Sequence, residues 1–293
     1  MKNLFKPAVT GVVLALSLFS AFATAGTVAV SPVNALAVTI FAPPGADLPQ
    51  DKLNEIAKRD VIVFIDSSKS MARSIGPDAR YCAETKVPSY ALSSEGESRW
   101  QWCSEQTDLL GKQLQNTLKD QLKVVVFSES YKEYKNVDLS SVPTFFSGTR
   151  PGGVTNATAA LRSQLRGYFA ARDQKKSDVR PLLVAIITDG SPDDPMSLRQ
   201  TIIDATKKMH NSAEITITFL QVGVDAKASK YLRELDNDLV GAGNTGTASD
   251  SVAHKSGNTI AALNEARYDI VTTKTFDQVN KSGLALALLD AVH

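Results

Sequence analysis

Segments of five to ten residues that are rich in apolar side chains recur along this chain and alternate with longer segments of helical spacing. A continuous apolar run bounded by polar residues is typical of a parallel strand that is covered on both faces. The pattern predicts such strands at 60–66, 122–127, 181–188 and 215–224, with a shorter one at 268–272. Each of these runs is therefore a candidate for the interior of a sheet.

One further segment, 131–137, alternates polar and apolar residues as an exposed edge strand does. Only a few residues separate it from the strand at 122–127. Because a parallel crossover needs a dozen residues or more, these two strands must pair antiparallel.

Helical spacing of apolar residues fills the intervals between the strands. We expect a short helix or turn at 53–59 and helices at 100–118, 156–171, 196–210, 230–239 and 276–292. Strands that alternate with helices indicate an α/β fold. We predict a doubly wound, Rossmann-like, mostly parallel six-stranded sheet with one antiparallel edge strand and helices on both faces.

The first 25 residues have the three parts of a signal peptide. Lys2 and Lys6 precede an apolar stretch at 8–22, and the small residues 23–25 suit cleavage after Ala25. We expect export to the periplasm or out of the cell. An uncleaved anchor is the alternative, since the apolar stretch approaches the length of a membrane span. No later segment is apolar for long enough, so no stable membrane span is expected after cleavage.

Beyond the signal peptide we expect an N-terminal extension or linker at 26–58 and one domain at 59–293, with insertions at about 72–99 and 241–267. The second insertion carries Gly241, Gly243 and Gly246 in GxGxxG spacing. These glycines follow a helix instead of a strand, which favours a plain insertion over a dinucleotide loop.

Composition excludes few classes of protein but does argue against a nucleic-acid partner. Hydrophobic residues make up 43% of the chain, which is ordinary for a packed domain. The formal charge of +1 becomes −1 when Lys2 and Lys6 are removed with the signal peptide. Neither sign dominates, whereas nucleic-acid binding needs a basic surface.

Cys82 and Cys103 are the two cysteines of the chain. In an exported protein an isolated pair favours a disulfide over two free thiols, because the compartment is oxidising. A zinc site is discarded because the pair has no histidines near it.

Polar side chains follow two of the predicted buried strands. Asp66, Ser68 and Ser70 come at the end of the first, and Asp189 follows the strand at 181–188. Between them in sequence, the loop GTRPGGVTNATAAL carries Thr155 into the helix at 156–171. In a doubly wound sheet such segments meet at the carboxyl edge. Carboxylate and hydroxyl oxygens together indicate a site for Mg²⁺ or Mn²⁺ and argue against zinc.

The three segments together resemble the von Willebrand factor A domain and its metal-ion-dependent adhesion site. The resemblance spans about 60–292 and includes FLQVGVD at 219–225, the YLRELDNDLVG that follows, and YDIVTT before the last helix. It implies that Ser68, Ser70 and Thr155 contact the metal directly, and that Asp66 and Asp189 act mainly through water.

The same resemblance implies a non-enzymatic module that binds a protein. Where hydroxyls supply most direct ligands, the ion keeps much of its positive charge and a vacant or water-filled position. It then accepts a carboxylate from another molecule. We therefore expect a protein partner that supplies an acidic residue to the metal.

Capping and turn formation are the plain alternatives for each motif. Thr155 has the position of an N-cap for the helix that follows it, and Asp189-Gly190 is also common in turns. Asp193 and Asp194 are expected to begin the next helix, where acidic residues are favoured, and not to bind metal.

A Mg²⁺-dependent phosphoryl hydrolase is the enzymatic alternative. Such sites need a second carboxylate two residues after the nucleophilic aspartate, and this chain has Ser68 there, which cannot act as an acid or base near neutral pH. The histidines His210, His254 and His293 form no recognisable triad, and no GxSxG elbow is present. A scaffold whose metal only stabilises the fold is the third possibility.

The disulfide is open to a direct test. Peptide mapping of the exported protein without reduction is expected to recover Cys82 and Cys103 in one linked pair, because the exported compartment oxidises neighbouring thiols. Recovery of both residues as alkylated thiols from the native protein would contradict the prediction.

Overall fold

The computed structural model describes residues 48–75, 98–114, 116–118, 122–137, 141–174, 179–239 and 265–292. All of them belong to one unit of the chain, Thr39–His293. The predicted signal peptide, Cys82 and most of the two predicted insertions lie outside the described residues. The disulfide therefore stays a prediction; its second member, Cys103, is buried.

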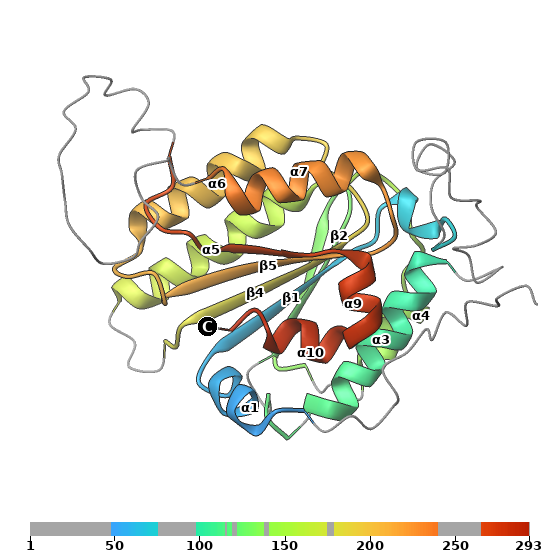
Figure 1. Ribbon diagram of the computed structural model, residues 1–293, viewed down its shortest axis with the longest axis horizontal. Coiled ribbons are helices and arrows are strands. Elements are labelled where there is room, and N and C mark those ends of the chain that lie inside the picture. Colours follow the sequence, from blue (N-terminus) through green and yellow to red (C-terminus); the bar gives the residue numbers. More distant parts are fainter. Residues whose placement is uncertain are drawn as a thin grey trace, which may run out of the picture. The chain divides into compact units, whose positions relative to one another are not determined.

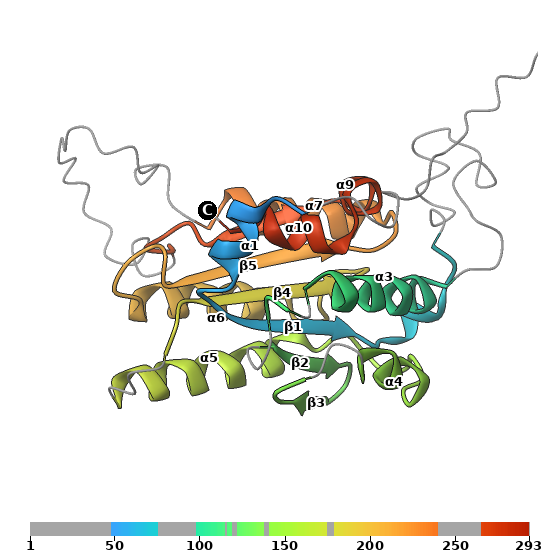
Figure 2. The same cartoon turned by 90° about the horizontal axis from the view of Figure 1, so that it is seen from below.

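Six strands form one sheet in the order β3-β2-β1-β4-β5-β6, and Figure 1 labels its four inner strands β2, β1, β4 and β5. Neighbouring strands run parallel, except that β3 is antiparallel to β2 and lies at the edge of the sheet (Figure 2). The predicted fold class is thereby confirmed. The strands are β1 (Asp60–Asp66), β2 (Leu122–Phe127), β3 (Tyr131–Tyr134), β4 (Leu182–Thr188), β5 (Ile215–Gln221) and β6 (Val271–Lys274).

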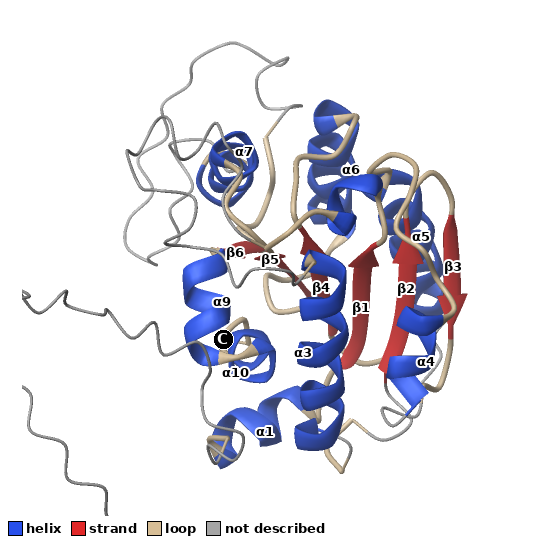
Figure 3. Ribbon diagram, turned by 90° about the vertical axis from the view of Figure 1, so that its right-hand side faces the viewer, coloured by secondary structure: helices blue, strands red, loops and turns tan. Residues whose placement is uncertain are grey.

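Helices cover both faces of the sheet (Figure 3). Successive residues of a strand point to opposite faces, so Val63 and Ile65 of β1 enter one core while Ile62 and Phe64 enter the other. The first core is covered by α1 (Gln50–Ile56), α3 (Arg99–Leu114), α4 (Val142–Ser147), α9 (Phe276–Ser282) and α10 (Leu284–Leu289). The second is covered by α5 (Ala157–Asp173), α6 (Pro195–Lys208) and α7 (Ala226–Asn237).

The prediction of one continuous helix at 276–292 is wrong. The segment forms α9 and α10, which are separated at Gly283. Gly283 has φ 78°, a conformation that glycine adopts readily and that a continuing right-handed helix cannot contain. The apolar spacing persists through the break because both helices pack on the same core.

Other differences concern element ends and one short helix. The predicted strand at 268–272 forms later, as β6, and α7 begins before the predicted 230 because Asp225 caps it by accepting a hydrogen bond from the Ala228 N–H at 2.8 Å. The sequence analysis missed α4, which is too short to show a period. It is held by packing: the Phe146 ring lies 4.6 Å from that of Trp100, centroid to centroid.

The strand order places a topological switch point at the carboxyl ends of β1 and β4, the position known as the crevice in doubly wound folds. From β1 the chain crosses through α3 to β2 on one side, whereas β4 lies on the other side of β1. Doubly wound sheets bind ligands where such connections diverge. Asp66 is the last residue of β1 and Asp189 follows the last residue of β4, so both carboxylates lie at this switch point. Within the described residues, no helix is long and apolar enough to span a bilayer.

The second core predicts the effect of removing a ring. Phe64 is fully buried and packs edge-on against Phe127, with ring centroids 6.3 Å apart. Replacing Phe64 with Ala is expected to lower the free energy of unfolding by about 3–5 kcal/mol, because the cavity cannot fully collapse. Urea unfolding measures this. Tyr131→Ala on the exposed edge strand is the control, with an expected loss below about 1 kcal/mol; equal losses would contradict the prediction.

Candidate functional site

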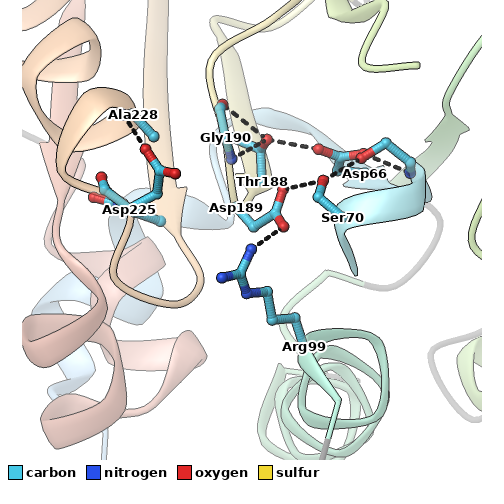
Figure 4. A network of polar contacts seen from close by, with 10 residues as sticks. Asp66, Ser70, Arg99, Thr188, Asp189, Gly190, Asp225 and Ala228 are labelled. Carbon is cyan, nitrogen blue, oxygen red and sulfur yellow. Dashed lines mark hydrogen bonds and ion pairs between the residues drawn. The ribbon is translucent and has the colours of Figure 1, made fainter. Parts of the chain in front are cut away.

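Asp66 joins the ends of β1 and β4. Its carboxylate is fully buried and accepts two hydrogen bonds: Oδ1 from the Ser68 N–H at 2.7 Å and Oδ2 from the Thr188 hydroxyl at 2.7 Å (Figure 4). Ser68 belongs to the loop after β1, and Thr188 is the last residue of β4. One carboxylate therefore holds together the two strand ends that border the crevice.

The two serines of the motif connect this loop to the second carboxylate. Lys69–Ala72 form a single 3-10 turn, and the hydroxyls of Ser68 and Ser70 lie 3.0 Å apart. The Ser70 hydroxyl donates a hydrogen bond to Asp189 Oδ1 at 2.8 Å (Figure 4). The structure thus brings Asp66, Ser68, Ser70 and Asp189 into one polar network.

Thr155 lies on a loop that is tied to the motif by its backbone. The Gly152 N–H donates to the Ser67 carbonyl at 2.8 Å, and the Lys69 N–H donates to the Gly153 carbonyl at 3.2 Å. Gly153 has φ 74°, which favours glycine at this close approach. Thr155 is 9% exposed.

The capping interpretation of Thr155 is wrong. Asn156 is the N-cap of α5, and its side chain accepts a hydrogen bond from the Ala159 N–H at 3.3 Å. Backbone groups of Thr155 instead bond to Asp193: its N–H donates to the Asp193 carboxylate, and its carbonyl accepts from the Asp193 N–H at 3.1 Å. Asp194, as expected, caps the next helix by accepting from the Ser197 N–H at 2.9 Å.

Arg99 belongs to this polar network and was not predicted from the sequence. Its guanidinium forms an ion pair with Asp189 Oδ2 (Figure 4), and both side chains are buried, at 4% and 0% exposure. Arg99 is the first residue of α3, and residues 76–97 separate it from the motif loop. No local pattern marks such a residue, because the pair joins segments 90 positions apart.

The two buried carboxylates have different electrostatic environments. Asp189 has Arg99 as its counter-ion, whereas Asp66 has no cationic partner among the described residues and is stabilised by neutral donors only. Burial is the main cause that raises the pKa of Asp66 to about 7, and repulsion from Asp189 adds to it; the hydrogen bonds from Thr188 and Ser68 oppose the shift.

The donor set fits a hard cation. Carboxylate and hydroxyl oxygens meet at the crevice, and the charge of Asp66 is uncompensated. Oxygen-only ligation suits Mg²⁺ or Mn²⁺. In the described part of the chain, no group of three or more His, Cys, Asp or Glu residues is arranged to hold a metal. Any cation at this position would have to take hydroxyl oxygens as ligands in addition to carboxylates.

No protein-family model and no curated protein matches the chain. Solved structures similar to it include manganese-loaded TRAP protein from Plasmodium vivax, which is 14% identical with a TM-score of 0.43 over 80% of this chain and 72% of that one. The PilB minor pilin from Streptococcus sanguinis is 14% identical, with a TM-score of 0.43 and coverage of 80% and 60%. A von Willebrand factor type A structure from Catenulispora acidiphila is 15% identical, with a TM-score of 0.34 and coverage of 59% and 36%.

This chain thus spans less than two thirds of the length of the last two structures. Similarity at this level carries no conclusion about ligand or partner. The fold assignment rests on the order and direction of the strands.

The raised pKa of Asp66 predicts how stability depends on pH in EDTA. An unfolded chain releases this proton near pH 3.8, whereas the folded protein keeps it up to about pH 7. The contribution to stability is therefore full below about pH 3.8, falls progressively as pH rises from there, and is lost once pH has passed about 7. Between pH 5 and pH 8, wild type is expected to lose about 2–3 kcal/mol of unfolding free energy relative to Asp66→Asn, which has no proton to release.

Urea unfolding of both proteins at the two pH values measures this difference. Groups that do not interact with Asp66 contribute equally to both proteins and cancel in the comparison. Parallel pH profiles for the two proteins would contradict the prediction.

Proposed function

We propose that this chain is an exported, non-enzymatic binding module of the von Willebrand factor A type. It holds Mg²⁺ or Mn²⁺ at the crevice between β1 and β4 and binds a protein partner there. An acidic residue of the partner completes the coordination of the ion. Export is inferred from the signal-peptide pattern of residues 1–25.

The uncompensated charge of Asp66 is the observation that carries the proposal. A buried carboxylate without a cation is costly, and here the cost raises its pKa. Two hydroxyls stand beside it in a network that ends on Asp189. A divalent cation at this position removes the repulsion between the carboxylates and supplies the charge that Asp66 lacks.

Each residue of the site has a distinct role in this proposal. Ser68, Ser70 and Thr155 are the direct ligands, and Asp66 and Asp189 act mainly through water. Neutral hydroxyls leave most of the positive charge on the ion, which would attract a carboxylate from outside the chain. A closed structural site would instead neutralise the ion with its own carboxylates.

Catalysis is the less favoured alternative because, within the described part of the chain, Asp66 has no second free carboxylate beside it to share the acid and base roles. Ser68 stands where a phosphoryl hydrolase of the expected type needs a carboxylate, and Asp189 is engaged in a buried ion pair. His210 follows α6 and lies near the start of β5, with its N–H bonded to Glu214. It is therefore at the opposite edge of the sheet from Asp66.

Metal binding by the purified chain tests the first part of the proposal. Titration calorimetry with MgCl₂ or MnCl₂ is expected to give one site per chain in wild type and none in Asp66→Ala, which removes the uncompensated carboxylate. Asp204→Ala is the matched control, since Asp204 is an exposed acidic residue on α6. Equal affinities in wild type and Asp66→Ala would overturn the proposed site.

Partner capture tests the second part. Immobilised wild-type protein is expected to retain a protein from envelope or culture fractions in Mg²⁺ and to release it in EDTA, with no retention by Asp66→Ala. Metal-dependent stabilisation without metal-dependent capture would favour the scaffold. Turnover of a phosphate ester that is abolished by Asp66→Asn would favour the hydrolase.

A further inference from the structure

The Arg99 side chain reaches into the crevice from a separate element. It extends from the first residue of α3 to Asp189 at the end of β4 and brings a positive charge to the side of the network opposite Asp66 (Figure 4). Arg99 is 4% exposed, so this is a buried group of the site and not a surface arginine that happens to lie near it.

Three segments build the slot that holds this side chain. The Arg99 N–H donates to the Arg73 carbonyl at 2.9 Å, and the adjacent Ser98 pairs with Ser74 in an isolated bridge. The third segment is the loop after β5, in which Gly223, with φ 76°, lies against the Arg99 side chain. A Cβ added at Gly223 would lie 2.7 Å from Arg99 Nε, so the absence of a side chain there is what makes room for the guanidinium.

The guanidinium is nevertheless incompletely satisfied. Arginine offers five N–H donors in a fixed plane, and buried donors without partners are costly. Nε of Arg99 is buried and has no hydrogen-bond partner among the described residues. The ion pair and the packing around it therefore hold the Arg99 side chain at Asp189, although its set of hydrogen bonds is incomplete.

We propose that Arg99 is a tethered cation that competes with the divalent ion for Asp189. Without metal, Arg99 neutralises Asp189 and allows the carboxylate to stay buried. With metal, two positive charges face the same carboxylate, so the ion binds more weakly than it would at a site without Arg99. This inference rests on the proposed metal site and adds what sets its affinity.

A purely structural ion pair is the alternative. Removing one partner of a buried pair is destabilising whatever its function, because it leaves an unpaired charge. The two interpretations predict different effects of metal on a variant that lacks Arg99. If Arg99 competes with the ion, its removal raises the metal affinity and makes the stability of the protein depend on metal. If the ion pair is only structural, its loss leaves the metal affinity and the metal dependence of stability unchanged.

Arg99→Gln is the central variant, because it removes the charge and keeps a polar side chain of similar reach. Calorimetry with MnCl₂ is expected to show at least a tenfold higher affinity than wild type. Thermal unfolding in EDTA is expected at a lower temperature than wild type, and saturating Mn²⁺ is expected to recover most of that loss, since the ion then neutralises Asp189.

Gly223→Ala tests the same inference without changing any charge, and it decides the matter if Arg99→Gln does not fold. Its Cβ would displace the guanidinium, so Mn²⁺ affinity is expected to rise, by less than in Arg99→Gln. Arg150→Gln is the control: Arg150 is exposed on the loop that carries Thr155, and the substitution changes the net charge equally. Its Mn²⁺ affinity is expected to stay within twofold of wild type.

The outcomes separate this inference from the proposed function. Wild-type binding that Asp66→Ala abolishes, together with an unchanged or lower affinity in Arg99→Gln, overturns the role of Arg99 and leaves the metal site standing. The role of Arg99 is also overturned if Arg150→Gln raises the Mn²⁺ affinity as much as Arg99→Gln does. Absence of Mn²⁺ binding in wild type, Arg99→Gln and Gly223→Ala overturns the metal site itself, and the competition with it.

Discussion

Two carboxylates buried at the adjoining ends of β1 and β4 are the constraint on which the rest of this site depends. Asp66 and Asp189 lie at the switch point of a doubly wound sheet, and both are buried. Burying like charges together is costly unless cations or donors compensate them. Arg99 compensates one carboxylate with charge, and Thr188 and Ser68 compensate the other with hydrogen bonds alone.

This unequal compensation relates the electrostatics to the proposed function. A site in which both carboxylates had internal counter-ions would have no use for an external ion, and a site in which neither had one would be hard to fold without metal. The observed arrangement lies between these extremes. It leaves Asp66 without a cationic partner among the described residues and places Arg99, the first residue of α3, against Asp189.

Much of the fold was predictable because its strands are buried on both faces. Residues of β1, β2, β4 and β5 contribute to two cores at once, which produces the long apolar runs in the sequence. The antiparallel edge strand followed from the short connection before it. Sequence periodicity failed where a single residue or a few contacts decide the outcome: Gly283 breaks the final helix, and α4 is stabilised by ring packing against Trp100.

For the site, the sequence alone determined which oxygen-bearing residues follow the buried strands. The motif at Asp66, Ser68 and Ser70 is local, and the position of Asp189 after a strand follows from strand pattern and chain topology. Only the tertiary structure decided the charge balance, because Arg99 meets Asp189 across 90 positions and fits where Gly223 lacks a side chain. Hydrophobic periodicity reports the burial of neighbouring residues, whereas an ion pair between distant segments leaves no periodic signal in either of them.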